Sequence, residues 1–206
     1  MGVNGVNYRA IKDGSGQNYE FDGDLEQYLL DKGVSAEHIN KMKCKILKQH
    51  RKELYEYYDG YGDYKEDTVL LKKVTQVRRG TVGQSVYENV RTLDGEREKE
   101  SFEKCLEELD LTTLEEVKKW YEEPYEKPNK RLPDSVLMFY YEDVGEYYVH
   151  EGNHRTLTAM LIGAEKIKAK VAVAHYDKKK KKEVMRRWFF QRMKDYIRRV
   201  LHLKRI

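Results

Sequence analysis

The chain has 206 residues, of which 37% are charged, and 40 Lys and Arg stand against 36 Asp and Glu. This length suits one well-buried core with a helical extension, and the net charge of +4 is too small to identify a partner. No apolar run approaches the ~20 residues that span a bilayer. Cys44 and Cys105 form no metal-binding pair, so we expect a protein of the reducing cytoplasm.

The first part of the chain is expected to be irregular and then helical. Residues 1–23 are rich in Gly, Asn and Asp without periodicity, which is typical of a loose arm. Residues 24–64 carry apolar side chains at helical spacing, with a break near Gly33 and Ser35 as the N-cap of a helix that continues to Tyr58. The lysines of this helix either decorate a solvated face or follow a phosphate backbone.

Residues 65–177 have the pattern of a small mixed sheet with helices, which predicts an α+β domain flanked by the N-terminal helical segment and a C-terminal helix. A polar loop with two glycines, Arg78–Ser85, follows its first strand. The other expected elements are a strand at Thr68–Val77, helices at Glu98–Leu109 and Thr113–Glu123, a loop at Glu122–Pro133 that contains all three prolines, and a hairpin of strands Val136–Tyr141 and Tyr147–His150.

The most informative stretch is Tyr147–Val173. A helix over Thr156–Ile162, closed by Gly163, follows its first strand, and Ile167–Val173 alternates apolar residues with lysines as a half-buried strand does. The turn between the first strand and the helix joins an acid, a glycine, an amide, an imidazole and a guanidinium. These residues are Glu151, Gly152, Asn153, His154 and Arg155.

Each residue type in this turn suits the binding of an anion. The N-terminus of a helix attracts negative charge, Gly152 lets the backbone approach a ligand, and Arg155 can grip phosphate oxygens with two bonds. His154 can donate to an anion or move a proton, and Glu151 can hold a metal ion or accept a proton. The alternative is an ordinary tight turn with Asn153 as N-cap and Arg155 as a solvated charge.

The strand, the Glu-Gly-Asn-His-Arg turn, the helix, Gly163 and the strand at Lys168–Val173 resemble the ParB/sulfiredoxin superfamily. The resemblance is good over Tyr147–Val173 and loose over Thr68–Tyr176. It implies a pocket for a nucleotide, ATP or CTP, with Mg²⁺ held by Glu151. The residues that it implies for phosphate binding are Gly152, Asn153, His154, Arg155 and Thr156, and those that it implies for catalysis are Glu151, His154 and Arg155.

At several positions the sequence departs from the motifs of related proteins, and these departures argue against particular activities. Asn153 stands where sulfiredoxins have their cysteine, so sulfinic-acid reductase chemistry is not expected. The order Asn153-His154-Arg155 differs from the Glu-Arg-Arg of the CTP-binding partition proteins. The turn also resembles part of the loop of Fic-type AMP transferases, but Tyr147 stands where their catalytic histidine would be. A zinc site at His150, His154 and His175 lacks further ligands.

Two classes of function therefore remain. The first is a nucleotide-dependent or phosphotransfer enzyme, or a nuclease, that acts on or with nucleic acid. The second is a non-catalytic DNA-binding module or regulatory protein whose pocket is a ligand switch or is vestigial. Fold-level analogy cannot choose between the two classes.

Residues 178–206 combine an apolar helical stripe with many Lys and Arg and two acids, Glu183 and Asp195. We expect a helix that packs its stripe, which includes Trp188, Phe189 and Ile197, on the protein's own core, or on a partner helix or second protomer. The basic side indicates a nucleic-acid surface or contact with an anionic membrane. The residues predicted to contact nucleic acid are Lys178, Lys179, Lys180, Arg186, Arg187, Arg198 and Arg199.

Overall fold

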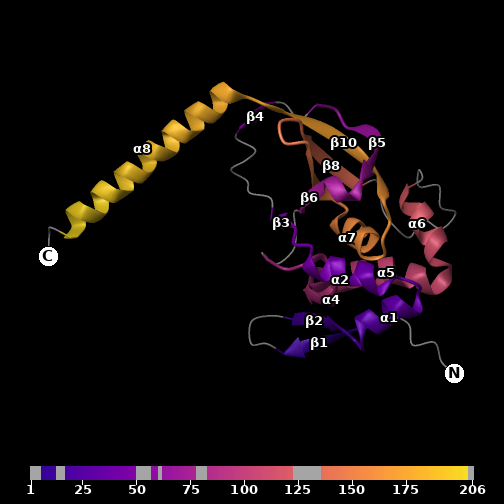
Figure 1. Cartoon of the computed structure of the whole chain (residues 1–206). Coiled ribbons are helices and arrows are strands. Elements are labelled where there is room, and N and C mark those ends of the chain that lie inside the picture. The colour runs from indigo at the N-terminus through magenta and orange to yellow at the C-terminus, as the bar shows by residue number, and fades with distance from the viewer. Residues whose placement is uncertain are drawn as a thin grey trace.

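The computed structural model of the protein describes residues 6–12, 17–49, 57–59, 62–77, 83–122 and 136–203. These residues form helices and two sheets, which confirms the predicted α+β class. Figure 1 shows the body as a stack of layers: the small sheet, a group of helices, helix α7 (Asn153–Leu161) and the large sheet. A long helix, α8 (Lys178–Leu203), runs away from this stack.

The large sheet has the strand order β3-β6-β9-β8-β10-β4, and β5 also pairs with β10. Strands β3, β6 and β9 run parallel, β8 is antiparallel to β9, and β10 is parallel to β8. The carboxyl ends of β3, β6 and β9 therefore lie at one edge of the sheet, and that of β10 lies at the opposite edge. The strands are β3 (Lys48–Gln49), β4 (Tyr58–Asp59), β5 (Lys65–Leu70), β6 (Val74–Val77), β8 (Val136–Tyr141), β9 (Glu146–Glu151) and β10 (Lys166–Tyr176).

The prediction of a loose arm over residues 1–23 is wrong for the part that the structure describes. Strands β1 (Tyr8–Lys12) and β2 (Gln17–Phe21) are antiparallel, and β7 (Thr92–Asp94) completes the small sheet beside β2. Tyr8 and Phe21 are buried and meet edge to face, with their ring centroids 5.5 Å apart. These aromatic side chains give the hairpin an apolar face that packs against the body.

The first helices are shorter than expected. Asp24 caps α1 (Leu25–Asp31), and Ser35, the predicted N-cap, accepts from the amide of His38 at the start of α2 (Ala36–Cys44). The expected continuation of this helix to Tyr58 is wrong, because the backbone is extended at Lys45 and β3 follows. The other helices of the described chain are α4 (Val86–Arg91), α5 (Glu96–Leu111) and α6 (Leu114–Glu122).

The run Thr68–Val77, predicted as one strand, belongs to two strands in different parts of the sheet. A 3₁₀ turn at Leu71–Lys73 separates β5, which pairs with β10, from β6, which pairs with β9. The turn lets Leu71 enter the core while its two lysines stay exposed. In contrast, the hairpin of β8 and β9, the helix that follows and the strand β10 are confirmed, and Gly163 ends α7 with φ 82°.

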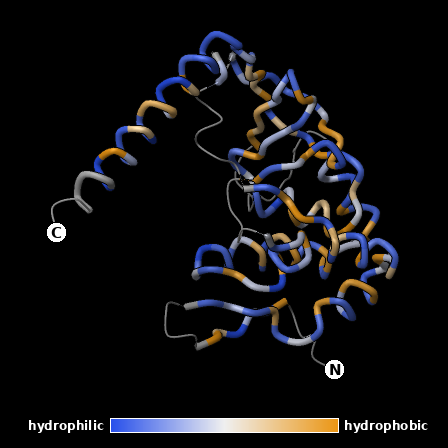
Figure 2. The backbone as a smooth tube through the Cα atoms, turned by 60° about the vertical axis from the view of Figure 1, so that its left-hand side comes forward, coloured by the Kyte–Doolittle hydropathy of each residue, from blue (hydrophilic) through white to orange (hydrophobic). Residues whose placement is uncertain are grey.

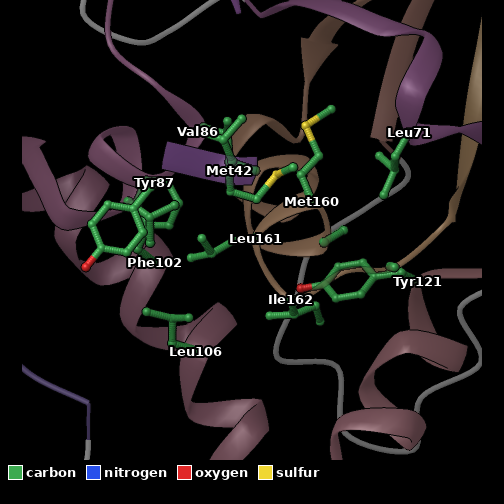
Figure 3. Close-up of a cluster of buried hydrophobic side chains, with 14 of the residues drawn as sticks. Met42, Leu71, Val86, Tyr87, Phe102, Leu106, Tyr121, Met160, Leu161 and Ile162 are labelled. Carbon is green, nitrogen blue, oxygen red and sulfur yellow. The ribbon is translucent and has the colours of Figure 1, made fainter. Parts of the chain in front are cut away.

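The main core lies between the large sheet and the helices. Figure 3 shows α7 surrounded by apolar side chains from α2, α4, α5 and α6. Met160 and Leu161 of α7 are 3% exposed or less, as are Met42 of α2 and Phe102 of α5. Because α7 is buried on nearly all sides, the position of its first residue is set by packing and not by the turn alone.

The opposite face of the large sheet carries an aromatic cluster. Its buried members are Tyr57, Tyr58, Phe139, Tyr141, Tyr148, Ala172, Ala174 and Val184, and Tyr176 and Trp188 pack against it. Thus the start of α8 is anchored on the sheet through Val184 and Trp188. Among the helices of the described residues, none is long and apolar enough to cross a membrane.

Candidate functional site

The predicted turn lies at the edge of the large sheet where three parallel strands end. The last residues of β3, β6 and β9 are Gln49, Val77 and Glu151, and α7 begins two residues after the last of these. Ligands of open α/β sheets bind at the carboxyl ends of strands, where helix N-termini gather. Of the polar loop Arg78–Ser85, which follows β6, residues 78 to 82 lie outside the described residues.

Gly152 forms the corner between β9 and α7. Its φ of 80° and ψ of 29° are left-handed, a conformation that residues with a β-carbon rarely adopt. A β-carbon at this position would also lie 2.9 Å from Cγ2 of Val136. The glycine is therefore required both by the backbone conformation and by the close approach of β8.

The N-terminus of α7 carries neither a side-chain cap nor an acidic residue in its first turn. Gly152 is the N-cap residue, so the alternative in which Asn153 caps the helix is wrong. Asn153 is instead the first helical residue and is 6% exposed, which places its amide inside the fold. The positive end of the helix dipole is thus not neutralised by a carboxylate of its own first turn.

Thr156 does not lie on the surface of the turn. The side chain is fully buried, and its hydroxyl donates to the carbonyl of Gly152 at 3.0 Å. This bond reinforces the first turn of α7, where the amide of Thr156 donates to the same carbonyl. Thr156 was predicted to bind phosphate, but its buried hydroxyl instead stabilises the corner at Gly152.

The two residues between Asn153 and Thr156 have different surroundings. The ring of His154 meets the ring of Phe102 edge to face, with centroids 4.8 Å apart and an interplanar angle of 86°. This contact turns His154 toward α5. Arg155, one residue further along α7, is half-buried, and the Nε of its guanidinium is buried.

Glu151 is exposed at the end of β9 and offers one carboxylate beside the turn. Within the described part of the chain, no three His, Cys, Asp or Glu side chains come together as a metal site would require. A single carboxylate beside a phosphate still fits Mg²⁺, which is commonly held by one or two carboxylates together with substrate phosphates.

Aromatic residues near Glu151 were not predicted as part of the site. Tyr64, which is 38% exposed, lies 5.9 Å from Phe139 between ring centroids, and Phe139 lies 5.2 Å from His150. Burial, and then the electrostatic influence of Glu151 and of Tyr148, raise the pKa of the Tyr64 hydroxyl. No motif marks Tyr64 in the sequence, since it is the pairing of β5 with β10 just after it that brings Tyr64 beside Phe139.

The predicted nucleic-acid residues lie at the other end of the sheet. Gly152 contacts Val136, which pairs with Ala169 of β10, and α8 begins just after Tyr176. The seven residue steps from Ala169 to Tyr176 span about 23 Å at the usual rise of a strand. The turn and α8 are therefore separate surfaces, and no single phosphate can contact both.

Helix α8 confirms the predicted helix but contradicts the predicted packing of its stripe. Trp188 is partly buried on the aromatic cluster, whereas Phe189 is 61% exposed and Ile197 is 49% exposed. The basic residues predicted for this helix are exposed, apart from Lys180, which is half-buried and donates from Nζ to the carbonyl of Tyr58 at 3.0 Å. Figure 2 shows that hydrophobic and hydrophilic positions alternate along α8.

The fold and the turn were compared with protein-family models, with curated proteins and with solved structures. None of the three comparisons found a match to this chain.

Proposed function

We propose that the turn from Gly152 to Arg155 binds a phosphate group, and that the protein is a nucleotide- or phosphate-binding protein that acts on or with nucleic acid. The observation that carries this proposal is the start of α7: a left-handed glycine packed against β8, no side-chain cap and no acid in the first turn. Such a helix end, at the carboxyl edge of parallel strands, favours an anion.

Neighbouring side chains support a nucleotide as the ligand. Arg155 stands in the first turn of α7 and supplies a positive charge. Glu151, exposed at the end of β9, offers a carboxylate for the Mg²⁺ ion that a triphosphate such as ATP or CTP carries. Tyr64, which is 38% exposed and close enough to Glu151 for that carboxylate to raise the pKa of its hydroxyl, offers an aromatic ring of the kind that stacks on nucleobases. The free thiols of the chain suit the cytoplasm, where nucleotides are present.

In the enzymatic form of this proposal, the residues divide the chemistry between them. Arg155 holds the phosphate, Glu151 holds the metal or accepts a proton, and His154 moves a proton. When bound, Mg²⁺ would neutralise the negative charge that develops on the phosphoryl oxygens. In the non-catalytic form, the same turn binds the nucleotide as a switch, and no bond is broken.

Calorimetric titration with ATP, CTP and inorganic phosphate, each with and without Mg²⁺, tests the proposal. Replacing Arg155 by Ala should weaken binding by about 1.5–3 kcal/mol, which is typical of a charge-assisted bond. Arg97, an exposed arginine of α5, provides the matched control, and Arg97→Ala should leave the affinity unchanged. If the wild-type protein binds none of these ligands, the proposal is wrong.

A second candidate, a nucleic-acid-binding module, is favoured by the exposed basic residues of α8. Contacts between Lys or Arg and phosphates release counterions, so the affinity should fall with salt by a logarithmic slope of about −0.9 per phosphate contacted. Gel-shift titrations at two salt concentrations measure this slope. Replacing Arg186, Arg187, Arg198 and Arg199 by Ser should flatten it and leave the fold intact, because all four are exposed.

A further inference from the structure

Helix α8 carries large apolar side chains that its contact with the sheet does not cover. Val184 is 1% exposed, and the ring of Trp188 lies 6.2 Å from that of Tyr57 between centroids. Beyond these two anchors the apolar side chains are largely in solvent. The apolar arc, as we name this set, consists of Phe189 (61% exposed), Phe190 (58%), Met193 (43%), Tyr196 (65%) and Ile197 (49%).

The apolar arc points away from the body of the protein. Met193 follows Val184 by nine residues, or about two and a half helical turns, so the two side chains lie on opposite sides of α8. Phe189 and Ile197, four residues before and after Met193, share its side. The sheet that buries Val184 therefore cannot also cover the arc, and Figure 1 shows α8 running clear of the body.

Basic side chains line both flanks of the arc. Arg192 and Lys194, the neighbours of Met193, lie about 100° to either side of it, and both are exposed. Arg199 repeats the position of Arg192 after seven residues, and Arg187 precedes Lys194 by the same interval. Asp195, the one acid within the length of the arc, lies two residues from Met193 and so on the far side of the helix.

This arrangement of charge selects among the partners that could cover the arc. A second copy of α8 would bring basic flanks against basic flanks, although paired helices need opposite charges there. A nucleic-acid backbone would use the basic residues and leave five large apolar side chains in water. An anionic bilayer accepts the apolar side chains at its acyl boundary, while the flanking Lys and Arg reach its headgroup phosphates.

We propose that α8 docks the protein on an anionic lipid surface, with the apolar arc inserted in the plane of the interface. Because the arc faces away from the sheet, a flat bilayer can reach it without contact with the body. Because α8 leaves from the edge opposite Gly152, docking leaves the phosphate-binding turn accessible. The proposal does not depend on what that turn binds.

Co-sedimentation of the full chain with vesicles tests this docking. Binding is expected to phosphatidylcholine vesicles that contain about one third phosphatidylserine, and to be much weaker with phosphatidylcholine alone. The double variant Phe189→Ser/Ile197→Ser should bind at least about tenfold more weakly. Each substitution removes an apolar side chain whose transfer from water into the bilayer interface favours binding. The double variant Leu111→Ser/Val144→Ser, which removes two apolar side chains exposed elsewhere, should bind as the wild type does.

Circular dichroism and thermal unfolding should be unchanged in both double variants, because all four residues are exposed. Binding to anionic vesicles that survives in the Phe189→Ser/Ile197→Ser variant would overturn the proposal, since charge alone would then explain it. Absence of vesicle binding overturns it as well. In that case, a dimer in solution that this variant abolishes would assign the arc to a second copy, and retarded migration of DNA would assign α8 to nucleic acid.

Discussion

Gly152 and Val136 lie so close that a β-carbon on the glycine would be 2.9 Å from Cγ2 and 3.1 Å from Cα of the valine. The contact joins the first residue of β8 to the corner between β9 and α7. It therefore determines where α7 begins relative to the sheet, and with it the position of the helix dipole and of Arg155.

Replacing Gly152 by Ala should lower the free energy of unfolding by about 2–5 kcal/mol. The estimate adds about 1–2 kcal/mol for a β-carbon in a left-handed conformation to about 1–3 kcal/mol for overpacking. Gly145→Ala is the matched control, because Gly145 has a φ of 67° but no atom closer than 4.0 Å to its added β-carbon. Urea denaturation measures both losses, and equal losses would show that the Val136 contact has no energetic weight.

If the protein is an enzyme, His154→Ala and Glu151→Gln should each slow the chemical step by about 10²–10⁴-fold, the usual contribution of a general acid or base. His154→Ala also removes the edge contact with Phe102. His154→Phe is therefore the sharper variant, because it keeps a ring against Phe102 but cannot carry a proton. Single-turnover kinetics compare the variants, and unchanged rates in all three would move the active centre elsewhere.

Much of the fold could be predicted because local periodicity marks it. The β8–β9 hairpin, α7 and β10 follow one another within forty-one residues, and each element has its own pattern and turn residues. The division of Thr68–Val77 into β5 and β6 could not be predicted, because it depends on pairing with two strands that lie far along the chain. The hairpin β1–β2 could not be predicted for the same reason, because its sheet is completed by β7, which lies far along the chain.

At the candidate site, the sequence identified the residue types but not their partners. The requirement for Gly152 depends on Val136, and the orientation of His154 depends on Phe102, which is 52 positions earlier. The error over α8 has a different cause. Trp188 and Phe189 were assigned to one stripe, although neighbouring helical residues differ by about 100° in direction. Counting turns from Val184 would have separated the anchored side from the exposed side.

Adjacent residues of α8 should therefore differ in their effect on stability. Trp188→Ala should lower the free energy of unfolding by about 1–3 kcal/mol, less than for a fully buried tryptophan, because its ring is only partly covered. Phe189→Ala should change it by less than about 0.5 kcal/mol, as is usual for an exposed position. Chemical denaturation of both variants checks this difference. A larger loss for Phe189→Ala would mean that the helix presents its other side to the sheet.

Tyr8 should make the stability of the protein sensitive to alkaline pH. Its ring is 3% exposed, and its hydroxyl donates to the carbonyl of Val90 at 2.8 Å. Burial, and then the charge of Glu103, raise the pKa of this hydroxyl well above its ordinary value. Below about pH 10 the tyrosine is protonated in both states, and its contribution is fully present. At higher pH only the unfolded state releases the proton, so the free energy of unfolding falls.

Tyr8→Phe isolates this effect from the other tyrosines. At pH 7 the variant should be less stable by about 1 kcal/mol, because the carbonyl of Val90 loses its donor in the core. The variant has no proton to release at this position, so its stability should fall less steeply above about pH 10. The difference in the free energy of unfolding should then shrink as the pH rises. Urea denaturation at several pH values from about 7 to 11 measures it, and a difference that stays constant would show that Tyr8 ionises equally in both states.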